Sequence, residues 1–160
     1  SNSRVSIDFG SSGNFLKDAG HVLVSVYTAG PELEQLSIEA SVRDNALDAY
    51  FLDMIGLIVL EKTGRHIKKI AMDKALQLGW GTSCLLSPGS VPGWELETQA
   101  KLCSLLPLEE IGVTIRDDAV LSPFKTVSCL IGMGPGYDSA KVGTTCRACS
   151  MKDTCQMQKK

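Results

Sequence analysis

The fold can be predicted from one stretch of the sequence, HVLVSVYT (residues 21–28), which is followed directly by AGP (residues 29–31). Its first part is short, apolar and rich in β-branched side chains, which is typical of a strand. Gly30 and Pro31 then favour a switch to helix, because proline is pre-organised for the first helical turn. The sequence therefore predicts a sheet and a covering helix within one unit.

Three helices are expected after this switch, and the first spans residues 31–42. The second spans 44–63. Its large side chains recur every three or four residues, the spacing of one buried face, at Leu47, Tyr50, Phe51, Met54, Ile55 and Ile58. Gly64 is expected to end this helix, and a third helix covers 65–78.

The rest of the chain mixes loops, short strands and one more helix. We expect an edge strand at 5–9, a structured loop at 79–93, a helix at 94–106, and strands at 111–116, 119–121 and 127–133. This order predicts an α+β fold, a mainly antiparallel twisted sheet with helices packed on it. Residues 1–140 would form the domain and residues 141–160 a cysteine-rich tail.

Composition limits the classes of partner. The 160 residues are 44% hydrophobic and 21% charged, which is typical of a soluble globular domain. A net charge of −2 argues against a nucleic-acid surface, which needs clustered Lys and Arg. No apolar run is long enough to cross a membrane, and no signal peptide is visible. We therefore expect a cytoplasmic protein, whose cysteines are ligands, reactive thiols or core residues rather than disulfides.

The tail carries the strongest local signal, Cys146-x2-Cys149-x5-Cys155. Thiolates so close in sequence can converge on one soft metal. We expect an iron–sulfur cluster, with zinc as the alternative; a disulfide or exposed thiols are the remaining interpretations. Such a site normally has four ligands, and the candidates for the fourth are Cys129 and Cys84. Cys103 lies in an apolar helix and is expected in the core.

Glu61 falls on the same helical stripe as Met54 and Ile58. A carboxylate there either reaches solvent near the helix end or binds a cationic group, because a buried carboxylate needs a partner. The chain shows no activated nucleophile and no acid–base pair, so independent catalysis is not expected. The run Gly132–Tyr137 lacks the last glycine of a dinucleotide-binding motif and is interpreted as a turn.

Several short motifs together resemble the activation domain of cobalamin-dependent methionine synthase, and most closely its small free-standing relatives. They are Ser87-Pro88-Gly89, Gln99 with Leu102 and Leu105–Leu106, Ile111-Gly112-Val113-Thr114, and Pro123-x-Lys125-Thr126-Val127-Ser128. The resemblance covers roughly residues 21–133, and the Cys-x2-Cys ending resembles the tails of those relatives. It implies the α+β fold of that family.

The resemblance also implies a site. The family's domain binds S-adenosylmethionine, docks over a corrinoid and restores methyl-cobalt after oxidation. Its helix glutamate matches Glu61, and its ligand loop matches Pro88 and Gly89. Ser90 stands where the family has a tyrosine near the corrinoid, and Leu85 where it has an arginine.

Three functions are expected from these patterns. The first is an accessory that docks a corrinoid-binding protein and assists its reductive activation or maintenance, receiving an electron from a donor through the cysteine site. The second is an S-adenosylmethionine-binding domain that remethylates cobalt. The third is an interaction module whose tail is stapled by zinc without a redox role.

Overall fold

A three-stranded antiparallel sheet is the centre of the computed structural model, which describes residues 5–143 and residue 154. Strand β1 (His21–Thr28) pairs along its whole length with β5 (Thr126–Gly134). The pairing runs from His21 opposite Met133 to Thr28 opposite Thr126. Strand β2 (Gly81–Thr82) pairs with the other edge of β5. The predicted strands at 21–28 and 127–133, and the α+β class with an antiparallel sheet, are confirmed.

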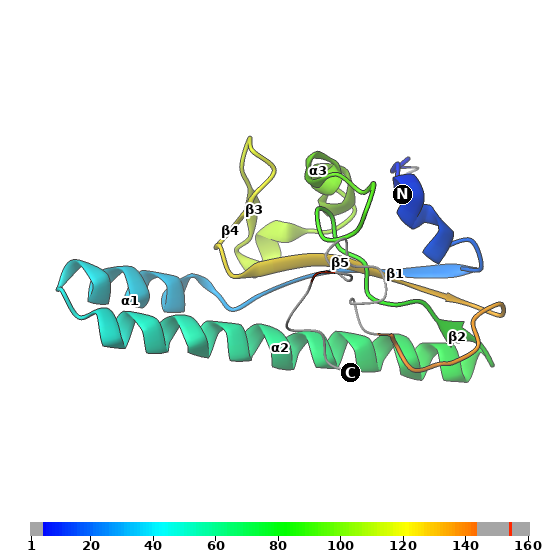
Figure 1. Cartoon of the computed structure of the whole chain (residues 1–160), viewed down its shortest axis with the longest axis horizontal. Coiled ribbons are helices and arrows are strands. Elements are labelled where there is room, and N and C mark those ends of the chain that lie inside the picture. Colours follow the sequence, from blue (N-terminus) through cyan, green and yellow to red (C-terminus); the bar gives the residue numbers. More distant parts are fainter. Residues whose placement is uncertain (1–4, 144–153, 155–160) are drawn as a thin grey trace.

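Elements cover both faces of this sheet (Figure 1). The long helix α2 (Ala46–Gln77) lies along one face. The other face carries the shorter elements, which are η1 (Gly10–Phe15), η2 (Leu96–Thr98), α3 (Gln99–Cys103), η3 (Leu108–Ile111) and the hairpin β3 (Thr114–Ile115) with β4 (Leu121–Ser122). Helix α1 (Pro31–Val42) runs antiparallel to the start of α2, and the two extend as a helical hairpin beyond the end of the sheet.

Strand β5 divides the core, because successive side chains of a strand point to opposite faces. Cys129, Ile131 and Met133 pack on the α2 side, against Ala71 and Ala75. Leu130 packs on the other side with Leu86, Trp94 and Leu102. The alternation makes β5 buried on both faces, so its sequence reads as a nearly continuous apolar run.

Helix α2 packs on α1 and on the sheet through small residues. Its buried positions are Ala49, Gly56, Gly64, Ala71 and Ala75. The predicted helix end at Gly64 was wrong, since α2 continues without a break to Gln77. A Cβ on Gly64 would lie 2.9 Å from Tyr27 Oη, so this glycine permits a close approach of helix and sheet.

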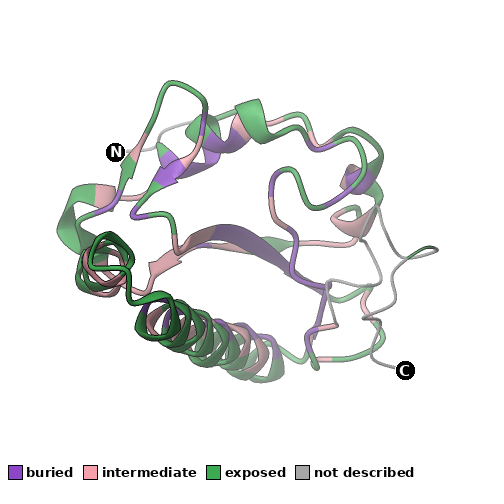
Figure 2. Cartoon of the chain, turned by 60° about the vertical axis from the view of Figure 1, so that its left-hand side comes forward, coloured by how far each residue is buried: buried purple, intermediate pink, exposed green. Residues whose placement is uncertain are grey.

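The predicted buried face of the helix was also wrong. Leu47 is 63% exposed, Tyr50 59% and Phe51 53%, and Met54, Ile55 and Ile58 are exposed as well. Figure 2 shows that the surface of α2 turned away from the sheet is largely exposed. The spacing of large side chains indicates an apolar side of a helix but does not identify the element that packs on it. No helix among residues 5–143 is long and apolar enough to cross a lipid bilayer.

Other elements are shorter than predicted. The helix expected at 94–106 is reduced to η2 and α3, and the strands expected at 111–116 and 119–121 pair only as the two-residue strands β3 and β4. Gly112 adopts a left-handed conformation (φ 65°) that ends η3, so β3 begins at Thr114 and not at the predicted residue 111. Residues 5–9 form no strand; Ile7 and Phe9 instead pack on the core beside Trp94.

Candidate functional site

The loop at residues 87–94 contains the residues predicted from the sequence to approach a ligand, Pro88, Gly89 and Ser90. It begins just after Leu86, whose backbone is hydrogen-bonded to Leu130 of β5. Gly89 has a φ of 72°, a conformation that favours glycine, and its N–H donates to the Trp94 carbonyl at 2.8 Å. Pro88 is buried, whereas Gly89 and Ser90 are exposed. The loop therefore holds two residues at the surface on a closed backbone turn.

Trp94 anchors this loop to the body of the protein. Its side chain is 1% exposed, and its ring meets the edge of Phe9 at a centroid distance of 4.8 Å. Gln99 fixes the following segment, because its amide donates to the Ala119 carbonyl and accepts a 2.6 Å hydrogen bond from Ser128 Oγ. These buried contacts position the loop rigidly on the face of the sheet opposite α2.

Glu61 lies on the other side of the molecule, on α2. Its side chain is 62% exposed and forms a 4.0 Å ion pair with Arg65 one turn later. Because α2 covers one face of the sheet and Gly89 follows the Leu86–Trp94 cluster on the other, the structure does not bring Glu61 and Gly89 together. Leu85 is buried on the α2 side as a core residue. S-adenosylmethionine binding by Glu61 and Pro88–Gly89 as one site does not fit this arrangement.

A cavity of about 360 Å³ opens where the chain leads into its cysteine-rich tail. Its polar lining comes from three separate segments and includes Asp18, Thr82, Ser83, Tyr137, Ser139 and Lys141. Thr82 ties the walls together, since its N–H donates to the Ser139 carbonyl at 2.8 Å and its hydroxyl to the Ala140 carbonyl at 3.1 Å. The sequence carries no motif for this cavity, because strand β2 is too short to show a period.

Tyr137, interpreted from sequence as part of a turn, is a wall of this cavity. Its hydroxyl donates to the Phe15 carbonyl at 2.7 Å. Burial raises the pKa of Tyr137 to about 12, with further contributions from the charges of Asp18 and Cys84. The phenol is therefore a neutral hydrogen-bond donor that joins η1 to the segment after β5.

The described cysteines occupy three different environments. Cys84 is 6% exposed, lines the cavity, and forms a β-bridge with Gly143, the last residue before the undescribed part of the tail. Cys129 is fully buried under α2, where burial raises the pKa of its thiol to about 12 and the charge of Lys68 opposes the shift. Cys103 is 2% exposed in the core, as predicted.

The three tail cysteines, Cys146, Cys149 and Cys155, lie outside the described residues. Within the described part of the chain, no group of three or more His, Cys, Asp or Glu side chains is placed to hold a metal ion. The two predicted fourth ligands differ in position. Cys84 lies beside Gly143, where the chain enters the tail, whereas Cys129 lies beneath α2.

No protein family matches the chain, and no curated protein matches it.

Proposed function

We propose that this protein is an accessory of a corrinoid methyl-transfer system, which docks a corrinoid-binding protein and assists its reductive activation or maintenance. The proposal starts from the ordered run of short motifs shared with the activation domain of methionine synthase, within an α+β fold of the same coarse class. The observation that carries it is the loop at residues 87–94, whose closed turn exposes Gly89 and Ser90 while Trp94 is buried beneath.

A rigid exposed turn suits docking onto a flat cofactor. Gly89 has no side chain, so a partner's group can approach the backbone closely. Loop residues that are already ordered lose little conformational entropy on binding. Ser90 replaces the family's tyrosine, so docking here would rest on the backbone of the turn and not on an aromatic side chain.

The docking site is tested by titration calorimetry with a purified corrinoid protein in its Co(II) state, starting with those encoded near this chain. Ser90→Glu would place an unpaired carboxylate in the docked interface and should weaken binding, raising Kd at least tenfold, about 1.4 kcal/mol. Lys74→Glu is the matched control, because Lys74 is exposed on α2 and away from the loop. The proposal is refuted if the native chain binds none of these corrinoid proteins.

The second part of the proposal is a thiolate metal centre formed by Cys146, Cys149, Cys155 and Cys84, with an iron–sulfur cluster as the expected group and zinc as the alternative. Cys84 supports this ligand set because it adjoins Gly143, only three residues before Cys146. Three residues of extended chain span roughly 10 Å, a length compatible with a shared metal. A bound cluster would supply one-electron transfer, whereas zinc would only stabilise the tail.

Metal analysis of protein purified without oxygen tests this centre. Native protein should contain iron and sulfide, and Cys84→Ala should lower the metal content, whereas Cys129→Ala should retain it. A colourless protein that contains zinc would reject the redox role and favour an interaction module whose tail is stabilised by zinc. Equal metal content in native protein and in a Cys146→Ala, Cys149→Ala double variant would reject the tail site itself.

A further inference from the structure

The outer surface of α2 carries a pattern that neither the core nor the proposed corrinoid site uses. Asp48, Phe51, Ile55, Ile58, Lys62 and Arg65 follow one another at alternating intervals of three and four residues. This is the spacing of a coiled-coil seam. We call these six residues the α2 stripe. Phe51, Ile55 and Ile58 are 53%, 46% and 48% exposed, so the apolar centre of the stripe faces solvent.

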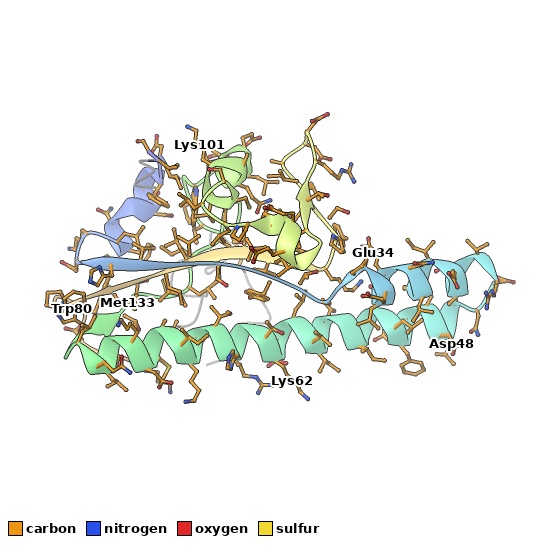
Figure 3. The ribbon with its side chains drawn as sticks, turned by 180° about the vertical axis from the view of Figure 1, so that it is seen from behind. Glu34, Asp48, Lys62, Trp80, Lys101 and Met133 are labelled. Atoms are coloured by element: carbon orange, nitrogen blue, oxygen red, sulfur yellow. The ribbon has the colours of Figure 1, made fainter. Side chains whose placement is uncertain are left out.

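The α2 stripe has opposite charges at its two ends. Asp48 stands at its start, near the tip of the helical hairpin, and Lys62 and Arg65 stand at its end, beneath the sheet. Figure 3 labels Asp48 and Lys62, which lie far apart along the helix. Among the described residues Asp48 and Lys62 form no ion pair; Asp48 accepts one hydrogen bond, from Asn45 Nδ2, and Arg65 has only the 4.0 Å contact with Glu61. The charges are thus available to a partner that runs in the opposite direction.

The exposed area is what a dimer interface requires. Six large apolar side chains on the outer side of α2 are exposed, namely Leu47, Tyr50, Phe51, Met54, Ile55 and Ile58. At about 100 Å² for each half-exposed aromatic ring and about 50 Å² for each of the others, they present on the order of 400 Å². Monomers rarely expose an apolar patch larger than a few hundred Å². A standard interface buries about 800 Å² on each partner, of which a little over half is apolar.

From these three observations we infer that two copies of this chain associate through the α2 stripe, as an antiparallel pair about a two-fold axis. In this register Ile55 of each copy packs against Ile58 of the other. Asp48 of each copy faces Arg65 of the other, and Phe51 covers the aliphatic stem of the other's Lys62. A two-fold axis repeats each contact, so one stripe supplies both halves of the interface.

A parallel pairing is disfavoured by the same residues. It would place Asp48 against Asp48 and Arg65 against Arg65, which repel each other. In the antiparallel pair the helical hairpin of each copy lies along the second half of the other copy's α2, where α1 adds its exposed Ile38 and Val42 at the edge of the interface. This association uses the face of the molecule opposite the loop at residues 87–94, so it leaves the proposed corrinoid site open.

Sedimentation equilibrium of the full chain with charge-swapped variants tests the inference. The native protein should have twice the chain mass. Asp48→Lys and Arg65→Glu should each raise the dimer Kd at least tenfold, since each change sets two pairs of like charges against each other. The double variant Asp48→Lys, Arg65→Glu should recover most of the affinity, because the pairs are restored with reversed sign. Lys74→Glu, an exposed charge reversal off the stripe, is the control and should have no effect.

All of these positions are exposed, so far-UV circular dichroism of dilute samples should show no loss of helix beyond the first turn of α2, where Asp48→Lys removes a hydrogen bond with Asn45. A native chain that remains monomeric at about 100 μM would overturn the inference, whether or not it then floats with phosphatidylcholine vesicles or binds a corrinoid protein through this face. A dimer whose affinity is unchanged by both single swaps, or is not recovered in the double variant, would overturn it equally.

Discussion

The small residues of α2 pack against the rest of the protein, whereas the sequence pattern predicted that its large side chains would. We therefore expect substitutions at the small residues to be the more destabilising. Ala71 has no exposed surface and packs among Cys129 and Ile131. Ala71→Leu adds three carbons where the helix touches the sheet, and overpacking of this kind costs about 1–3 kcal/mol. Tyr50 is 59% exposed, although the spacing of apolar residues predicted it to be buried. Tyr50→Ala should therefore cost less than about 1 kcal/mol, whereas truncation of a buried aromatic costs about 3–5 kcal/mol.

Urea unfolding at low micromolar protein concentration, followed by circular dichroism, measures both effects as shifts of the midpoint at constant slope. With a slope of about 2 kcal/mol per molar urea, Ala71→Leu should lower the midpoint by roughly 0.5–1.5 M, and Tyr50→Ala by less than about 0.5 M. The opposite order, with Tyr50→Ala the more damaging of the two, would refute the described packing of α2. A slope that changes in either variant would mean that the unfolding is no longer two-state and would require a second probe.

Three further predictions concern buried polar groups and surface charge. Gln99→Leu leaves the Ala119 carbonyl and the Ser128 hydroxyl without their partner and should cost about 1–3 kcal/mol; in a double-mutant cycle, adding Ser128→Ala should recover part of that loss, and strictly additive costs would argue against the hydrogen bond. Burial raises the pKa of the Cys129 thiol from 9.0 to about 12, so the unfolded state loses this proton first and the free energy of unfolding should fall as pH rises from about 9 to about 12. Cys129→Ala should reduce that slope in unfolding curves measured across this pH range, and an unchanged slope would contradict the burial of the thiol. Glu61→Gln removes only an exposed ion pair and should alter stability by less than about 0.5 kcal/mol, while a loss above 1 kcal/mol would indicate a buried role for Glu61.

The candidate site was predictable from the sequence only where a residue acts through its local backbone. Gly89 has a left-handed conformation in a tight turn, and the Pro88-Gly89 pair predicts such a turn from local sequence alone. The cavity beside the tail was not predictable in the same way. Asp18, Thr82 and Tyr137 come from three segments distant in sequence, and the pairing of β1 and β2 with β5 brings these segments around one cavity.

Strands β1 and β5 and helix α1 follow from local sequence, because β-branched runs and a Gly-Pro switch set backbone preferences that the fold does not oppose. The helical preference and the apolar character of α2 can be read in the same way. Contacts between distant segments were needed to show that α2 continues through Gly64, that its small residues are the buried ones, and that Cys129 and Cys84 have different surroundings. The physical reason is that periodicity describes the sides of one element, whereas burial depends on the closest approach of two elements, and a helix without large side chains on one side can approach a sheet most closely there.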